Sequence, residues 1–211
     1  AEVARSCPSP RHAIVMPVNV IFVLGGPGAG KGTQCSALAE KHGFAHYSAG
    51  DLLRAEVASG SETGNQIKDM LKNGEIVPSE VTIGLLKNAI ETTPECEVFL
   101  IDGFPRNIYQ GEKFEEEVTE CKGVVFLDAD QEVMEERLLS RADAARAAGA
   151  PVRTDDNKES MKKRFKTHFD TCMPVVEHYK GKGKVHPVSA AQCKEEVTSE
   201  VEAVLKKLEI L

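Results

Sequence analysis

A glycine-rich loop near the amino terminus carries the residues best suited to phosphate chemistry. It reads Gly25-Gly26-Pro27-Gly28-Ala29-Gly30-Lys31-Gly32-Thr33. Glycines let successive backbone N–H groups converge on one anion, because side chains there would block the approach or forbid the dihedral angles. Lys31 adds a charge that can follow a transferring phosphoryl group. An ordinary turn between a strand and a helix is the alternative, but it would not require this lysine. We interpret the loop as a nucleotide phosphate site.

Arginines in four separate segments could converge on a polyphosphate. Arginine suits this task because its planar guanidinium donates two hydrogen bonds to one phosphate and keeps its charge. Taken singly, each arginine would be interpreted as an exposed charge that needs no explanation. The candidates are Arg54, Arg106, Arg141, Arg153 and Arg164, whereas Arg137 and Arg146 are interpreted as surface or auxiliary residues.

The acidic candidate is Asp102, which ends the apolar run Val98–Asp102. A carboxylate at the end of a strand beside the loop could hold the water shell of Mg²⁺, although a carboxylate that caps a turn is the alternative. Gly32 stands where Ser or Thr usually holds magnesium in such loops, and Thr33 follows one residue later. We therefore expect no direct side-chain metal ligand, and magnesium held through water near Asp102 and Thr33.

A parallel sheet is needed to bring these residues together. The run Val18–Leu24 is apolar throughout and ends in the glycine loop, as expected for a strand buried on both faces. Stretches with helical spacing of apolar residues separate the later apolar runs, and this alternation of strands and helices predicts an α/β fold. The further predicted strands are Ala45–Tyr47, Val98–Asp102, Val124–Asp128 and Val185–Val188.

Three helices are predicted from apolar spacing. Two of them should each pack one face on the sheet, and the third should end or bend at Pro174, because proline lacks a backbone N–H. Their faces are Val81, Leu85, Leu86 and Ile90; Val197, Val201, Val204, Leu205 and Leu208; and Met161, Phe165, Phe169 and Cys172.

Two segments depart from this regular alternation. Residues Gly50–Pro78 form a polar and mainly helical insert, and Ala142–Asn157 is rich in alanine and charge. Excursions of this length in a compact domain are usually lids or binding segments.

Composition excludes several classes of protein. The 211 residues are 41% hydrophobic and 28% charged, which excludes a disordered chain, and the net charge of −7 argues against a nucleic-acid partner. The six cysteines form no CxxC pair, so neither a zinc site nor a disulfide framework is predicted. No apolar run is long enough to cross a membrane, and residues 1–17 lack a secretory core. We expect a cytoplasmic protein, with a nuclear pool left open, whose residues 1–17 form a disordered extension.

The end of the glycine loop and four later blocks together form the sequence pattern of a known family. They are Gly30–Gln34, Ser48-Ala49-Gly50-Asp51-Leu52-Leu53-Arg54, Gly74–Pro78, Asp102–Arg106 and Arg153–Asn157. Over Val18–Leu211 the chain resembles the nucleoside monophosphate kinases, with the eukaryotic UMP/CMP kinase branch most similar and adenylate kinases next. The resemblance implies a P-loop fold with a five-stranded parallel sheet and helices on both faces. It also implies a monomer that uses ATP, a nucleoside monophosphate and Mg²⁺, with an acceptor-binding segment at about 48–77 and a lid at about 141–155.

The resemblance assigns roles to individual residues. Arg54 and Arg106 would bind the monophosphate, Arg141 the ATP phosphates, and Arg153 and Arg164 would bridge donor and acceptor, with Lys31 and Asp102 completing the catalytic set. The implied ATP site is Gly28, Ala29, Gly30, Lys31, Gly32, Thr33, Arg141 and Gln192. The implied acceptor site is Ala49, Arg54, Glu75, Ile76, Val77, Gly103, Phe104, Pro105, Arg106, Gln110, Arg153 and Arg164. Asp155 and Asp156 would orient the lid arginines.

Two positions bear on the choice of base. Gln110 resembles the position that reads the acceptor base, but its amide could pair with adenine, cytosine or uracil. Ala49 lies in a Ser-Ala-Gly-Asp block that is similar to pyrimidine kinases, where adenylate kinases usually have Thr. We expect UMP or CMP as acceptor, dCMP as a further candidate, and AMP as the alternative.

Other nucleotide-binding classes fit less well. A GTPase-like switch would need a guanine-specifying Asn-Lys-x-Asp motif, which is absent, and it would leave the arginines unexplained. A kinase acting on a non-nucleotide acceptor would not account for the blocks at Gly74–Pro78 and Gly103–Arg106. The predicted lid contains no cysteine, so no structural metal is expected there.

Overall fold

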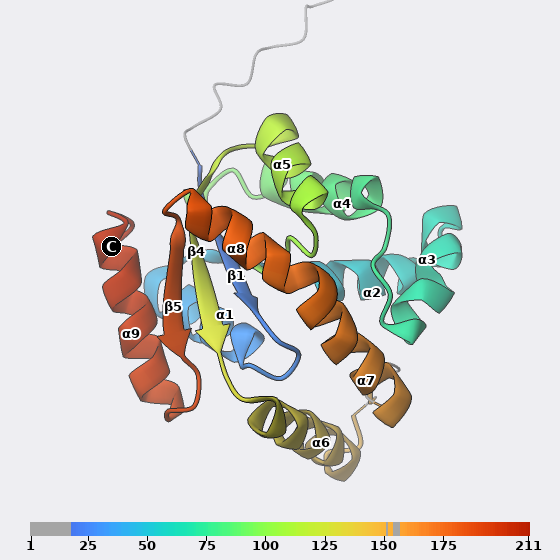
Figure 1. Ribbon diagram of the computed structural model, residues 1–211. Helices are drawn as coiled ribbons and strands as arrows, with labels where there is room; N and C mark the ends of the chain where they lie inside the picture. The colour runs from blue at the N-terminus through green and yellow to red at the C-terminus, as the bar shows by residue number, and fades with distance from the viewer. Residues whose placement is uncertain (1–17, 151, 154–156) are drawn as a thin grey trace, which may run out of the picture.

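The computed structural model describes residues 18–150, 152–153 and 157–211 (Figure 1). Their strands form one parallel sheet in the order β2-β3-β1-β4-β5. The strands are β1 (Asn19–Gly25), β2 (Ala45–Ser48), β3 (Val98–Asp102), β4 (Cys121–Asp128) and β5 (Val185–Ser189). The predicted fold class and all five predicted strands are confirmed. The expectations for residues 1–17, Asp155 and Asp156 lie outside the described residues.

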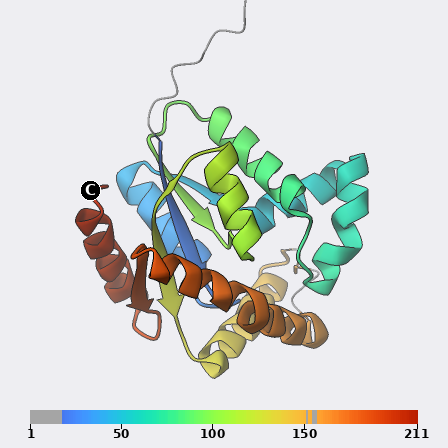
Figure 2. The ribbon, with the colours of Figure 1, turned by 45° about the horizontal axis from the view of Figure 1, so that its top comes forward.

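Helices cover both faces of the sheet (Figures 1 and 2). Successive residues of β1 point to opposite faces. Phe22 packs with α4, α5 and α8 in one apolar cluster, while Ile21 and Val23 pack with α1 and α9 in the other. The helices are α1 (Lys31–His42), α2 (Ala49–Ser59), α3 (Glu62–Asn73), α4 (Ser79–Glu91), α5 (Ile108–Glu117), α6 (Gln131–Ala147), α7 (Lys158–Thr167), α8 (Met173–Gly181) and α9 (Lys194–Lys207).

The register of the sheet brings the predicted chemistry to one edge. Val23 lies opposite Asp102, and Gly25 lies opposite Leu127. Because all strands run in the same direction, the glycine loop after β1 and the carboxylate at the end of β3 meet at the carboxyl edge. Parallel α/β sheets bind their ligands at this edge.

The helix α4 divides its apolar residues between two clusters, which corrects the prediction of a single face. Leu86 and Ile90 pack into the sheet core, whereas Val81 and Leu85 pack against Leu53, Ile67 and Val77. The reason is that the insert after β2 brings α2 and α3 to the side of α4. The helix therefore joins the insert to the sheet. The face predicted for α9 is correct, since its apolar residues pack in the second sheet cluster.

The third predicted helix is α7, and it continues through a π-helical turn, His168–Cys172, into α8. Pro174 therefore does not end the helix. The N–H of Met173 donates to the carbonyl of His168, five residues earlier, and this extra residue shifts the inward face. As a result His168 is buried and Phe169 is 49% exposed, so the prediction that Phe169 faces inward is wrong.

Figure 1 shows α6 below the carboxyl ends of the strands, and α2 and α3 on the right of the sheet. The first predicted excursion consists of α2, α3 and the turn to α4, and we call residues 48–77 the acceptor segment. The second begins in α6, which runs to Ala147 because alanine favours the helix; we call residues 141–155 the lid segment. Within the described part of the chain, no helix combines the length and the apolarity needed to cross a membrane.

Candidate active site

A cavity of about 710 Å³ opens at the carboxyl edge of the sheet. The glycine loop forms its floor, and residues from α2, the turn after α3, α6, α7 and the loop after β5 complete the wall. The predicted residues that line it are Gly28, Ala29, Gly30, Lys31, Gly32, Thr33, Arg54, Glu75, Asp102, Gly103, Arg106, Arg141, Arg153, Arg164 and Gln192. All five predicted arginines therefore surround the same space as the loop.

The conformation of the loop explains its glycines. Gly28 has a φ of 90°, and a Cβ atom built there would lie 2.3 Å from the carbonyl oxygen of Met134. Gly30 has a φ of 93° and precedes α1, so that the first N–H groups of this helix point to the cavity end of the loop. A helix start of this kind attracts anions through its free N–H groups and its dipole.

The side chain of Lys31 is held over the glycine loop by backbone carbonyls of that loop. Its ammonium donates to the carbonyl of Gly25 at 2.9 Å and to that of Gly26 at 2.8 Å. Burial lowers the pKa of Lys31, and nearby arginines lower it further, while the carboxylate of Asp102 acts in the opposite direction. An anion in the cavity would supply the missing counter-charge, so the site favours binding of a polyphosphate.

Oxygen atoms suited to magnesium lie on the cavity wall at Asp102 and Thr33. Asp102 is 8% exposed and lines the cavity together with Thr33, and both offer the oxygen donors that magnesium prefers. A Cβ atom on Gly32 would lie 3.4 Å from Oδ2 of Asp102, so the start of α1 closely approaches the carboxylate. Among the described residues no cluster of three or more His, Cys, Asp or Glu could hold a metal alone. The residues fit an ion that they would hold through water.

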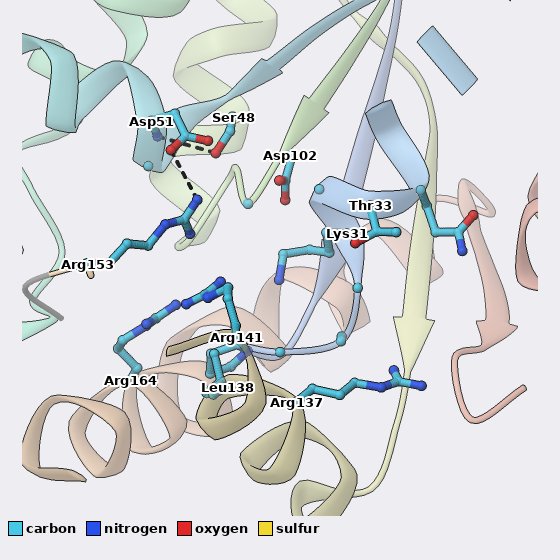
Figure 3. A pocket seen from close by; sticks show the side chains of 18 of the residues that line it. Lys31, Thr33, Ser48, Asp51, Asp102, Arg137, Leu138, Arg141, Arg153 and Arg164 are labelled. Atoms are coloured by element: carbon cyan, nitrogen blue, oxygen red, sulfur yellow. Dashed lines mark hydrogen bonds and ion pairs between the residues drawn. The ribbon is translucent and has the colours of Figure 1, made fainter. Parts of the chain in front are cut away.

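The arginines enter the cavity from different elements. Arg141 lies on α6, Arg164 on α7 and Arg153 in the lid segment, and all three point into the cavity on the side opposite Asp102 (Figure 3). Such an arrangement surrounds an anion with donors from several directions. Arginines fixed in this way can stabilise charge on a transferring phosphoryl group.

The lid segment and the acceptor segment meet at Asp51. Its Oδ1 atom accepts from Arg54 on the next helical turn and, at 3.3 Å, from Arg153 (Figure 3). Burial alone would raise the pKa of Asp51, but the hydrogen bond from Arg54 and the charges of Arg54 and Arg153 lower it below the usual value. The carboxylate thus orients two of the predicted phosphate-binding arginines.

The turn after β3 is fixed by Gln110. Its Oε1 atom accepts from the backbone N–H of Arg106 at 2.9 Å, and the side chain of Asn107 caps the start of α5. Gln110 is 2% exposed and does not line the cavity. In this structure Gln110 therefore supports the backbone of Arg106.

Several predicted acceptor residues lie behind the cavity wall. Phe104 is fully buried, and its ring packs against Phe22 with centroids 5.6 Å apart. Pro105 lines a smaller cavity of about 70 Å³ behind Lys31. The remaining residues that do not line the main cavity are Ala49, Ile76, Val77 and Gln110. These residues were predicted to bind the acceptor, but in the structure they do not line the main cavity.

Arg137 and His46 are among the lining residues that were not predicted as site residues. Arg137, interpreted as a surface or auxiliary residue, lines the wall and donates to the carbonyl of Ala190 at 2.8 Å. Its position four residues before Arg141 on the same helix was the available signal. His46 also lines the wall, with Nε2 at 3.8 Å from Asp102, and no spacing in the sequence links these two residues. Arg146 pairs with Asp143 on the surface, as interpreted.

Comparison with known proteins identifies relatives that cover most of the chain. The family model described as adenylate kinase matches residues 23–184. UMP-CMP kinase 3 of Arabidopsis thaliana is 51% identical over 88% of this chain and 88% of its own length. Adenylate kinase 1 of Schistosoma mansoni is 48% identical, over 89% of this chain and 93% of its own. Uridylate kinase of Saccharomyces cerevisiae is 47% identical, over 90% and 91%.

Proposed function

The chain belongs to the adenylate kinase family and is a nucleoside monophosphate kinase, and on this premise we propose that its preferred acceptors are UMP and CMP. The reaction is the reversible transfer of the γ-phosphoryl group of ATP to the monophosphate, giving a nucleoside diphosphate and ADP. The observation that carries the phosphoryl transfer is the convergence of Lys31 and five arginines on the cavity above the glycine loop.

The proposed mechanism rests on position and charge. The monophosphate binds Arg54 and Arg106, and its phosphate oxygen attacks the γ-phosphorus of ATP while the bond to the β-phosphate oxygen breaks. Arg153 and Arg164 contact both phosphates, and Lys31 and Arg141 hold those of ATP. The transition state is loose, so donors fixed in advance supply most of the acceleration and no covalent nucleophile is required.

Exclusion of water is the second requirement, because water would otherwise accept the phosphoryl group. We propose that the acceptor segment and the lid segment close over their substrates. The contact between Arg153 and Asp51 joins the two segments in this structure, which supports the proposal. Closure would then depend on the bound acceptor, so that the arginines surround the γ-phosphate only when an acceptor phosphate is there to receive it.

Mg²⁺ is the proposed cofactor. Asp102 and Thr33 would hold it through water beside the ATP phosphates, where bound magnesium neutralises their charge. This assignment is supported by the oxygen donors on the cavity wall and by the close approach of Gly32 to Asp102. We further propose that the protein acts as a cytoplasmic monomer.

The choice of base is supported by the sequence block around Ala49 and by relatives named for UMP and CMP. AMP is the second candidate, because a relative of 48% identity is named adenylate kinase. The two candidates differ in the base alone, so they share one phosphate site.

The test is steady-state turnover with ATP and Mg²⁺ and, separately, UMP, CMP, dCMP, AMP or GMP. The wild type is compared with Arg106→Ala. UMP and CMP should have the highest kcat/KM, and the variant should lose at least about a hundredfold with every acceptor, as when a fixed donor is removed from a transition state. A highest kcat/KM for AMP would replace the pyrimidine assignment by the second candidate.

A further inference from the structure

A buried serine on α7 binds the backbone of the acceptor segment. The hydroxyl of Ser160 donates to the carbonyl of Lys72 at 3.0 Å, across 88 positions of sequence. Lys72 belongs to the last turn of α3, and Ser160 is 6% exposed. The bond satisfies a carbonyl at the end of a helix, where no partner exists within the helix itself.

The Ser160 side chain is also held by Asn157. The Asn157 amide donates to the hydroxyl of Ser160 at 2.9 Å, and its Oδ1 accepts from the Ser160 backbone N–H at 2.9 Å. Since the hydroxyl oxygen already accepts from Asn157, its proton is available for Lys72. The start of α7 and the end of α3 therefore form one hydrogen-bonded unit.

The turn after α3 packs on the same face of α7. Gly74 has a φ of 71°, and a Cβ atom built there would lie 2.8 Å from Cγ of Arg164 and 3.4 Å from the carbonyl oxygen of Ser160. Ser160 and Arg164 are four residues apart and so share a face of the helix. The contact places Gly74 and Arg164 side by side on the cavity wall.

The apolar packing of the acceptor segment is separate from α7. Leu53, Ile67 and Val77 form an apolar cluster of their own, apart from the two sheet clusters. Val81 and Leu85 of α4 pack against this cluster, which includes no residue of α7. The polar contact between α3 and α7 therefore helps to set the position of the acceptor segment relative to Arg164.

From these contacts we propose that Ser160 is a positioning residue, which ties the acceptor segment to α7 so that the segment and Arg164 take their places together. The inference rests on the proposed function, because it concerns the same phosphate site. Loss of the Ser160–Lys72 bond should let the segment and Arg164 move independently. The acceptor would then be held less well, while the ATP site on the glycine loop would be unchanged.

The kinetic test uses Ser160→Ala, which keeps the backbone N–H that Asn157 caps, and Ser160→Thr, which keeps the hydroxyl. Ser160→Ala should lower kcat/KM for the acceptor about three- to tenfold, as expected for one buried hydrogen bond, with KM for ATP within twofold of the wild type. Ser160→Thr should restore most of the loss. Ser199→Ala is the matched control, because Ser199 is an exposed serine on α9 that bonds only its own helix.

Hydrogen exchange provides a readout independent of turnover. In Ser160→Ala the amides of α3 and α7 should both exchange faster, while those of β1 and β3 keep the wild-type rate. Unchanged acceptor kinetics, an equal rise in KM for ATP and acceptor, or faster exchange in α7 alone would overturn the proposal. A wild type that turns over no monophosphate would refute the proposed function instead, and the exchange measurement would still test the coupling.

Discussion

The guanidinium of Arg153 lies 3.3 Å from the carboxylate of Asp51 and joins the lid segment to the acceptor segment across the cavity. Asp51 also binds Arg54, so one carboxylate orients two arginines that come from different parts of the chain. The side chain of Asp51 is 57% exposed, and exposed ion pairs contribute about 0–1 kcal/mol. The pair therefore aligns the arginines more than it stabilises the fold.

The first prediction compares the two partners of this ion pair. Arg153→Ala should lower kcat by about 10²–10³, because it removes a donor aimed at the transferring phosphoryl group. Asp51→Asn should lower kcat no more than about fivefold, the equivalent of 1 kcal/mol, since it removes only an orienting contact. Single-turnover measurements on both variants make the comparison. Equal losses would mean that Arg153 acts through Asp51 and not on the phosphates.

Lys31 provides the second prediction. Lys31→Met should reduce kcat by about 10²–10³, because the ammonium is the charge held directly over the loop. The midpoint of thermal unfolding should not fall, since burial disfavours the charged lysine in the folded state. Kinetics and calorimetry on the same preparation separate the two effects. A loss of kcat below tenfold would exclude Lys31 from the catalytic set.

The sequence was sufficient to predict the five strands and the loop, because buried parallel strands and glycine-rich phosphate loops have local signatures. It predicted the five arginines that line the cavity but not Arg137, since the side of α6 that faces the cavity depends on the packing of Met134 and Leu138. Arg137 was missed for this reason. Phe169 was misplaced because a π-helical turn shifts the register by one residue, and its i→i+5 bond leaves no mark in the apolar spacing.

The third prediction concerns the loop glycines. Gly30→Ala should destabilise the fold by about 1–2 kcal/mol, because alanine is strained at positive φ and no atom lies within 4 Å of the new Cβ. Gly28→Ala should cost a further 1–3 kcal/mol or so, since its Cβ also meets the backbone of Met134. Urea unfolding of both variants measures the difference. Equal stabilities would mean that α6 shifts freely away from the loop.

The fourth prediction is a pH dependence of stability. Burial, together with the charge of Lys31, lowers the pKa of His168 from 6.5 to about 4. Between these values the unfolded chain binds a proton that the folded protein does not, so stability falls as the pH decreases. His168 alone should remove about 2 kcal/mol between pH 7 and pH 5, at 1.36 kcal/mol per pKa unit.

The matching variant is His168→Gln, which keeps a polar side chain but cannot titrate. Its free energy of unfolding should fall less than that of the wild type between pH 7 and pH 5, by about the same 2 kcal/mol. Between pH 7 and pH 8 the two proteins should show the same dependence, because the histidine is largely neutral in both states there. Parallel curves down to pH 5 would refute the assignment.

The acceptor site was the part of the function that the sequence left most open. Gln110 was identified by position, yet its carbonyl oxygen binds the Arg106 backbone and its side chain lies behind the cavity wall. A sequence pattern records that a residue is needed, but not whether it touches the ligand or supports the residue that does. Ala49 and Val77 are likewise buried. Each packs in an apolar cluster with residues of α4 and does not line the cavity.

The most direct test of the central claim is a competition for one labelled phosphoryl group. The wild type receives γ-³²P-labelled ATP with Mg²⁺ and an equimolar mixture of UMP, CMP and AMP, and the labelled diphosphates are separated at early times. The account predicts that label appears in UDP and CDP before it appears in ADP, with little inorganic phosphate. Label that enters ADP first, or that is released only as inorganic phosphate, would contradict it.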